Sequence, residues 1–161
     1  MTTKAEFNAE EWSLILEAGP TAAMVVIRAD KGGTVRESLS IGKTYAAEQQ
    51  NAAATELLAA IVADRPELDT KRYTDPSEIA TVGLQRVRGA VDTVQQKGTQ
   101  PEVEDFKRFL YEVARHAAEA HKEGGFLGIG GTRVSEQEAE ALQRLADTIG
   151  YEAPPLEATG E

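Results

Sequence analysis

Hydrophobic residues recur every three or four positions along most of this chain, which is the spacing of a helix that buries one face. Two stretches show the pattern most clearly, and a Gly-rich segment separates them. The first contains Val103, Phe106, Leu110, Val113 and Ala117, and the second contains Ala139, Leu142, Leu145, Ala146 and Ile149. We therefore predict a long helix, a Gly-rich loop, and a last helix that ends at Gly150.

Helix starts are marked by residues that cap the free N–H groups of a first turn. In a capping box, a Ser, Thr or Asn stands three residues before a Glu, and each side chain accepts a hydrogen bond from the other residue's backbone. Three such boxes are predicted: Asn8 with Glu11, Thr34 with Glu37, and Ser135 with Glu138. Phe7 is expected to pack on Trp12 as a hydrophobic staple in front of the first helix.

Gly and Pro residues divide the remaining pattern. Gly19 and Pro20 are expected to end a short first helix and begin a second one. In that second helix, the run 22–27 is apolar on all sides, so other helices should surround it. The Val-Val-Ile part of the run also favours a strand, but helix is preferred because no other segment offers a strand to pair with.

The pattern as a whole predicts an all-α, single-domain bundle of about seven helices over residues 1–151. The Gly-rich loop lies between the last two helices. Residues 152–161 lack periodicity and contain two adjacent prolines, so we expect a disordered acidic tail.

Charge and composition narrow the function. The 161 residues carry a formal net charge of −10 and no cysteine. An acidic surface repels phosphate backbones, so nucleic acid is not an expected partner. The longest mainly apolar stretch, 22–27, is too short to span a bilayer. Without cysteine there is no disulfide framework or thiolate site, and we expect a cytoplasmic protein.

The Gly-rich loop is the most unusual stretch in the chain. Residues 125–132 have the outer glycines and the hydroxyl of a phosphate-binding loop, but a Gly stands where the Lys should be, and a helix precedes the loop instead of a strand. Its apolar residues either fold under the loop to cap the core or face a partner. The partner or ligand contacts would come from Gly125, Phe126, Leu127, Ile129 and Gly130.

Residues typical of catalysis are sparse. His116 and His121 stand five positions apart and point in different directions, so one helix face cannot use both to chelate a metal. Glu112 shares a helix face with His116 at a spacing of four, which is typical of a solvated ion pair. Acids such as Glu102 and Glu104 fit the first turn of a helix, where they complement its dipole. No cofactor is expected.

Two helix, Gly-turn, capped-helix units can be compared with a known pattern. Residues 29–37 and 120–138 match Ala-Asp-Gly-x-[Ile/Val]-[Ser/Thr]-x-x-Glu in part, and the chain therefore resembles the TerB-like (tellurite-resistance) helical family. Lys31 is an additional residue in the first unit, and the second unit lacks the Asp and contains an insertion. The resemblance implies an all-helical stress-response protein with acidic ion ligands.

Three functions remain open. The leading hypothesis is a non-enzymatic cytoplasmic binding or scaffold protein that contacts a protein partner, or a second copy of itself, through the Gly-rich loop. The second is an ion-binding stress protein whose oxygen ligands would be Asp30, Glu37, Glu123 and Glu138. The third is a small enzyme of unknown reaction that uses Glu112 and His116.

Overall fold

The computed structural model describes residues 1–29, 35–64, 76–123 and 134–156, and within them the chain is all-helical with no strand. The three segments α4, η3 and α5 follow one another without a break, so the described residues form six helices. The elements are η1 (Lys4–Glu6), α1 (Ala9–Ile27), α2 (Val35–Gln49), α3 (Glu56–Ala63), α4 (Pro76–Glu78), η3 (Ile79–Gly83), α5 (Leu84–Lys97), α6 (Gln100–Glu123) and α7 (Glu136–Ile149). The fold class predicted from the pattern is confirmed.

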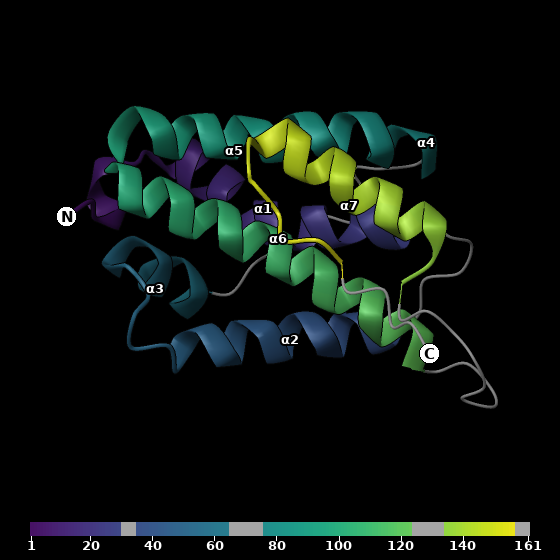
Figure 1. Cartoon of the computed structure of the whole chain (residues 1–161). Helices are drawn as coiled ribbons and strands as arrows, with labels where there is room; N and C mark the ends of the chain where they lie inside the picture. The colour runs from purple at the N-terminus through teal and green to yellow at the C-terminus, as the bar shows by residue number, and fades with distance from the viewer. Residues whose placement is uncertain (30–34, 65–75, 124–133, 157–161) are drawn as a thin grey trace.

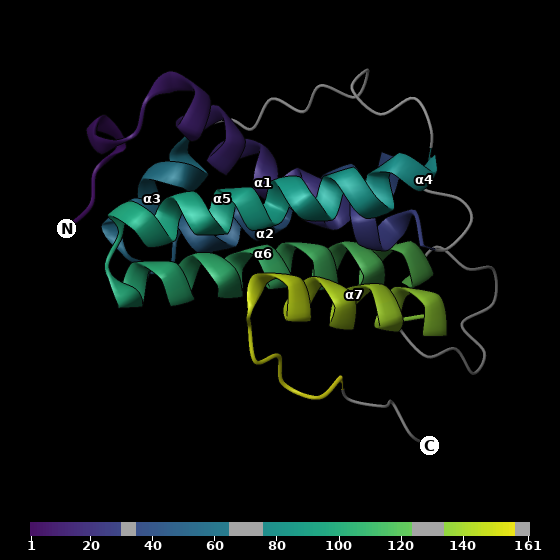
Figure 2. The same ribbon diagram turned by 90° about the horizontal axis from the view of Figure 1, so that it is seen from above.

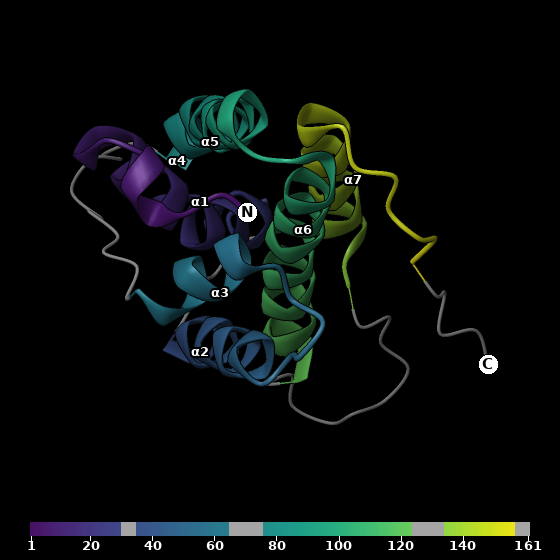
Figure 3. The ribbon, with the colours of Figure 1, turned by 90° about the vertical axis from the view of Figure 1, so that its left-hand side faces the viewer.

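Helices α1 and α6 lie at the centre of the bundle (Figure 1). Helix α1 packs on α5, α6 and α7, and α6 also packs on α2 and on α7. Seen along the bundle axis, α5 and α7 lie on one side of this central pair, and α2 and α3 lie on the other (Figure 3). None of the described helices is long and apolar enough to cross a membrane.

The predicted break at Gly19 and Pro20 is wrong, because α1 runs through both residues from Ala9 to Ile27. This is why the bundle has six helices where about seven were expected. Proline in a helix interior removes one hydrogen bond, which favours an end or a kink. Here the surrounding packing outweighs that cost, since both residues and the three that follow them, Thr21, Ala22 and Ala23, are buried.

Gly19 is needed because another helix approaches it closely. A Cβ at this position would collide with the hydroxyl of Tyr45 on α2. The Tyr45 ring lies edge-on to Phe109 of α6, with 5.1 Å between the ring centroids. Its hydroxyl is buried without a hydrogen-bond partner, and burial raises the pKa of the phenol. The contact brings α1, α2 and α6 together at one point.

The capping predictions can be checked at two of the three boxes. Both hydrogen bonds of the Asn8 and Glu11 box form, and so do both bonds of the Ser135 and Glu138 box. Thr34 of the third box lies outside the described residues. The staple is confirmed too, since the rings of Phe7 and Trp12 lie 5.8 Å apart. Gly150 ends α7 in the left-handed conformation, with φ +66°.

The first turn of α6 is tied to the start of the chain. Glu102 lies in the first turn of α6, as predicted, and it is only 3 % exposed. Its carboxylate accepts hydrogen bonds from the backbone N–H and the hydroxyl of Thr2, at 2.9 and 2.7 Å. It accepts two more from the N–H and hydroxyl of Thr99, at 2.7 and 3.0 Å. The acid therefore holds the N-terminal segment against the α5–α6 connection.

The residues after α7 turn back over α6. Tyr151 lies 5.4 Å from Tyr111 between ring centroids, and Ala153 packs against the core. Residues 151–156 contain no regular secondary structure, and residues 157–161 of the predicted tail lie outside the described residues.

Candidate functional site

The Gly-rich loop predicted to contact a partner lies outside the described residues. This applies to Gly125, Phe126, Leu127, Ile129 and Gly130, and to Asp30 of the predicted ion site. The helices that lead into and out of these segments meet at one end of the bundle. In two perpendicular views, α1 and α6 end there and α7 begins there (Figures 1 and 2).

Three of the predicted ion ligands lie on helix ends that the structure describes. Glu37 is in the first turn of α2 and Glu123 is the last residue of α6, but their side chains lie outside the described part. Glu138 is in the first turn of α7 and is fully buried. Within the described residues, no group of three or more His, Asp or Glu side chains comes together as metal ligands.

Glu138 does more than the capping box requires. One carboxylate oxygen, Oε2, accepts from the backbone N–H of Ser135 at 2.9 Å. The other oxygen, Oε1, is buried and has no hydrogen-bond partner. A buried carboxylate oxygen without a donor is costly, because it has lost its water without a replacement. The predicted cap is confirmed, and the unpaired oxygen is a feature that the sequence did not indicate.

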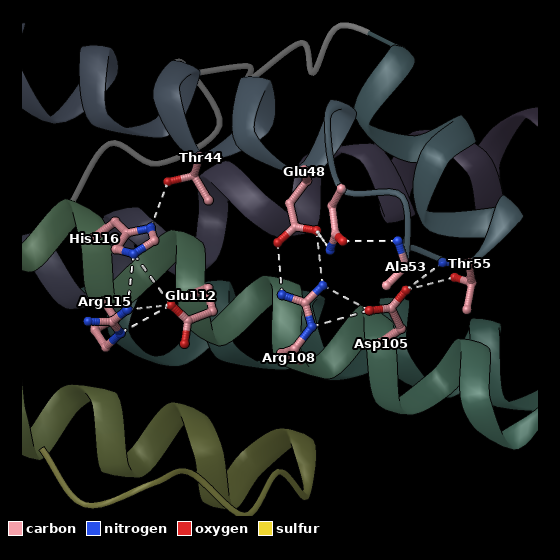
Figure 4. Close-up of polar contacts among 10 residues, drawn as sticks. Thr44, Glu48, Ala53, Thr55, Asp105, Arg108, Glu112, Arg115 and His116 are labelled. Carbon is pink, nitrogen blue, oxygen red and sulfur yellow. Dashed lines mark hydrogen bonds and ion pairs between the residues drawn. The ribbon is translucent and has the colours of Figure 1, made fainter.

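A row of ion pairs joins α6 to α2 (Figure 4). Arg108 donates two hydrogen bonds of 2.8 and 3.0 Å to the carboxylate of Glu48, and it donates another of 2.8 Å to Asp105. The guanidinium lowers the pKa of Glu48, and Glu48 in turn raises that of Arg108. Asp105 also accepts from the N–H and hydroxyl of Thr55, the cap of α3. Arg108 therefore fastens α2 and α3 to α6.

The second part of this row contains the predicted pair of Glu112 and His116, whose Oε2 and Nε2 atoms lie 3.4 Å apart. Arg115 Nη2 is 2.6 Å from the same carboxylate oxygen and 3.0 Å from His116 Nε2. On its other side, His116 Nδ1 lies 3.0 Å from the Thr44 hydroxyl of α2 (Figure 4). The Thr44 contact could not be predicted, because it joins residues on two different helices.

A hydroxyl, an imidazole and a carboxylate in this order resemble the parts of a nucleophilic triad. Exposure argues against that role. Thr44 is only 4 % exposed, and its hydroxyl also lies 3.0 Å from the backbone carbonyl of Ser40. A buried hydroxyl that already serves a helical carbonyl has no path to a substrate. The donor directions are consistent if Arg115 donates to Nε2, Nδ1–H donates to Thr44, and Thr44 donates to Ser40. The group joins two helices.

The opposite end of the bundle carries a recess that the sequence did not indicate. It has a volume of about 700 Å³ and lies between η1 and the first half of α1. Aromatic and aliphatic side chains dominate the lining, with polar groups at the rim. The lining residues are Lys4, Ala5, Phe7, Asn8, Ala9, Trp12, Ser13 and Leu16.

The floor of this recess is held from behind by Asp64, the residue after α3. Its Oδ2 atom accepts from Lys4 Nζ and from the indole N–H of Trp12, each at 2.7 Å. These hydrogen bonds lower the pKa of Asp64, and the bond from Lys4 has the larger effect. The Lys4 ammonium also lies 5.5 Å above the Trp12 ring. The recess therefore has a fixed shape.

Comparison with models of known families, with curated proteins and with solved structures gave no match to this chain.

Proposed function

We propose that this protein is a non-enzymatic binding protein whose recess between η1 and α1 takes the apolar face of a helix from a protein partner. One observation carries the proposal: a concave, mainly apolar surface with a fixed floor opens between these two elements. Its volume of about 700 Å³ falls in the range of roughly 300–1,000 Å³ that is typical of ligand pockets. It can therefore hold more than one side chain.

The form of the recess favours a helix. Its lining continues from Ala5 of η1 through Ala9 at the start of α1 to Leu16, so it includes about two turns of α1. An amphipathic helix offers apolar side chains at spacings of three and four, and these fill such a groove from above. The small side chains of Ala9 and Ser13 on the rim let a second backbone come close.

Charge favours a basic partner. The chain has a formal net charge of −10, and the exposed Glu6 and Glu10 stand next in sequence to the lining residues Ala5 and Ala9. Lys4 at the rim is already paired with Asp64. A basic amphipathic helix would be steered toward such a surface, and salt would weaken the steering.

Trp12 allows a direct test, because it is the single tryptophan of the chain and lies on the floor of the recess. The probe is a synthetic Leu- and Lys-containing amphipathic helix, titrated into the full-length protein. We expect saturable binding with a shift of Trp12 fluorescence. A control peptide with the same charge and with Ser in place of Leu should not bind. Equal binding of both peptides would contradict the proposal.

Two matched variants separate the recess from the rest of the surface. Ala9→Leu fills the rim of the recess, while Ala59→Leu adds the same atoms at an exposed position of α3. We expect Ala9→Leu to weaken peptide binding at least tenfold and Ala59→Leu to leave it unchanged. If both variants bind as the wild type does, the helix does not occupy this recess.

The Gly-rich loop remains a second proposed contact surface. Phe126→Ala and Ile129→Ala should weaken association with a natural partner, or self-association, more than they lower thermal stability. Sedimentation velocity and thermal melts of both variants test this. A monomeric wild type that retains no partner would count against the loop. We also propose a cytoplasmic location, from the lack of cysteine, and a TerB-like stress role, from the sequence resemblance alone.

A second function, ion binding, is supported by the unpaired Oε1 of Glu138. A bound cation would satisfy this oxygen, and Glu37, Glu123 and Asp30 are the further ligands proposed from sequence. Melting temperatures measured with Mg²⁺, Ca²⁺, Mn²⁺ and Zn²⁺ test the idea, together with elemental analysis. Glu138→Gln is the matched variant, because Gln also completes a capping box. We expect one ion to raise the wild-type melting temperature but not that of the variant; no shift in the wild type would exclude the site.

A further inference from the structure

A second cavity is lined by residues at the end of α1 and in α7. Figure 1 shows that α1 ends and α7 begins at the same end of the bundle. It has a volume of about 230 Å³. Arg28 follows α1 directly, and Arg144 is in the middle of α7. Both residues line the cavity, above an apolar floor that includes Val25 and Ala80. Two exposed arginines therefore line one small cavity in a chain whose net charge is −10.

These two arginines differ from the other arginines of the described residues. In residues 1–29, 35–64, 76–123 and 134–156, the side chains of Arg28 and Arg144 make no hydrogen bond and no ion pair. Each other arginine whose side chain the structure describes has a carboxylate partner: Arg86 with Glu17, Arg88 with Asp92, Arg108 with Glu48, and Arg115 with Glu112. Among the described side chains, the two arginines without a carboxylate partner thus both line this cavity.

The remaining polar groups of the cavity add to the chemistry. Gln137 is in the first turn of α7 and brings an amide donor to the lining. The first turn of a helix also carries a positive partial charge from its free N–H groups. Glu140 is the one acid of the lining, so the charged side chains sum to about +1. A planar guanidinium binds a carboxylate or a phosphate through two parallel bonds.

We propose that this cavity binds a small oxyanion, a carboxylate or phosphate group, between Arg28 and Arg144. The site shares no lining residue with the recess, so it can be tested independently of the proposed partner helix. The apolar floor would face the remainder of the ligand.

The cavity has fixed walls, which favour a specific ligand. On one side, the five-residue π-helix η3 places the small side chain of Ala80 in the lining. Gly83 of the same segment lies so close to α1 that a Cβ would come within 3.0 Å of Val25 Cγ2. Short π-helical segments are rare and frequently occur at functional sites. This packing locks η3 on α1 and keeps the cavity open beside the contact.

Glu140 stands one turn before Arg144, the favourable order for an ion pair, but the two side chains do not come within 4.0 Å of one another. A simple anion would be repelled by Glu140. A ligand with an amino group beside its anion would instead be held by it. Glu140→Gln therefore distinguishes these two kinds of ligand. It should strengthen the binding of a simple anion and weaken the binding of an anion that carries an amino group.

Isothermal titration calorimetry of the full-length protein at low salt tests the site, with inorganic phosphate, glutarate and glutamate as probes. We expect saturable binding of at least one probe. Arg28→Gln and Arg144→Gln should each weaken it about tenfold or more, as loss of a two-bond charged contact does. The matched control is Lys43→Gln, since Lys43 is an exposed cation of α2 outside the cavity.

The outcomes are distinct. Lys43→Gln should bind within about twofold of the wild type, and far-ultraviolet circular dichroism should show all variants folded. Loss of binding in both arginine variants but not in the control supports the site. No saturable binding of any probe, or equal weakening in all three variants, would overturn it. The Trp12 titration with the amphipathic peptide should be unchanged in the arginine variants, which keeps the two proposals separable.

Discussion

Glu102 offers the most quantitative test of the physical reasoning. Its carboxylate is buried, which alone would raise its pKa, but the four hydrogen bonds from Thr99 and Thr2 outweigh burial and lower the pKa to about 2 from its ordinary value of 4.5. A carboxyl whose pKa is lower in the folded state stabilises the fold above its unfolded pKa. That contribution is lost as the pH falls through the folded pKa.

The magnitude follows from the size of the shift. A difference of about 2.5 pKa units corresponds to roughly 3 kcal/mol of stability at neutral pH, at 1.36 kcal/mol for each unit. The contribution falls to about 1 kcal/mol near pH 3, where the unfolded state is already protonated. The window in which stability is lost therefore runs from about pH 4.5 down to about pH 2.

Glu102→Gln is the perturbation to make, because Gln keeps the size of the side chain. Three of the four hydrogen bonds are accepted by Oε2 of Glu102. If the NH2 group of Gln took the place of Oε2, it would face three hydrogen-bond donors and could accept from none of them. Urea unfolding followed by Trp12 fluorescence gives the free energy at each pH. We expect the variant to be less stable than the wild type by about 3 kcal/mol at pH 7, with the gap closing on acidification.

Glu104→Gln is the control, since Glu104 is in the same helix turn but its side chain is 48 % exposed. Its surface ion pair with Lys107 should contribute less than about 1 kcal/mol at any pH. A gap between wild type and Glu102→Gln that stays constant from pH 7 to pH 3 would refute the account of Glu102. So would a gap no larger than that of the control.

Three further predictions concern stability. Gly19→Ala should lower the free energy of unfolding by about 1–3 kcal/mol through overpacking against the Tyr45 hydroxyl. In a double-mutant cycle, adding Tyr45→Phe to Gly19→Ala should restore most of the lost free energy of unfolding, because it removes the hydroxyl that the new Cβ meets. If the losses of the two single variants simply add, the contact is contradicted. Glu48→Gln should lower the free energy of unfolding in urea by about 1–3 kcal/mol, because it weakens the two hydrogen bonds from the part-buried Arg108. If 1 M salt abolishes this difference between variant and wild type, the two residues form a solvated ion pair and the prediction is wrong. Gly150→Ala should lower the melting temperature by a few degrees, since a φ of +66° is unfavourable for a residue with a Cβ. An unchanged melting temperature would mean that α7 can end in another backbone conformation.

Local chemistry made much of the fold predictable. The boxes at Asn8 and Ser135, the staple at Trp12 and the glycine end at Gly150 depend on residues a few positions apart, so the sequence contains the whole interaction. The apolar faces of α6 and α7 follow from the helical period in the same way, and all the residues that define them are buried except Ala139, which is partly exposed.

Contacts between distant residues were not predictable. Nothing in the sequence shows that Pro20 stays inside a helix, because that depends on the packing of the other helices around it. Thr44 is 72 positions from His116, and a lone sequence gives no signal that pairs them. The sequence places Glu138 in a first turn, but its burial depends on which helices face that turn. The recess and the arginine cavity likewise arise from how helices are placed.

The central position of α1 has a consequence for biosynthesis. This helix is synthesised before the helices that cover its apolar surface, α5, α6 and α7. While the ribosome is still translating, the stretch 21–27 is therefore exposed to water and to other nascent chains, a state that favours aggregation. A chain that terminates before α6 could not shield it, so productive folding must wait until α6 and α7 have emerged.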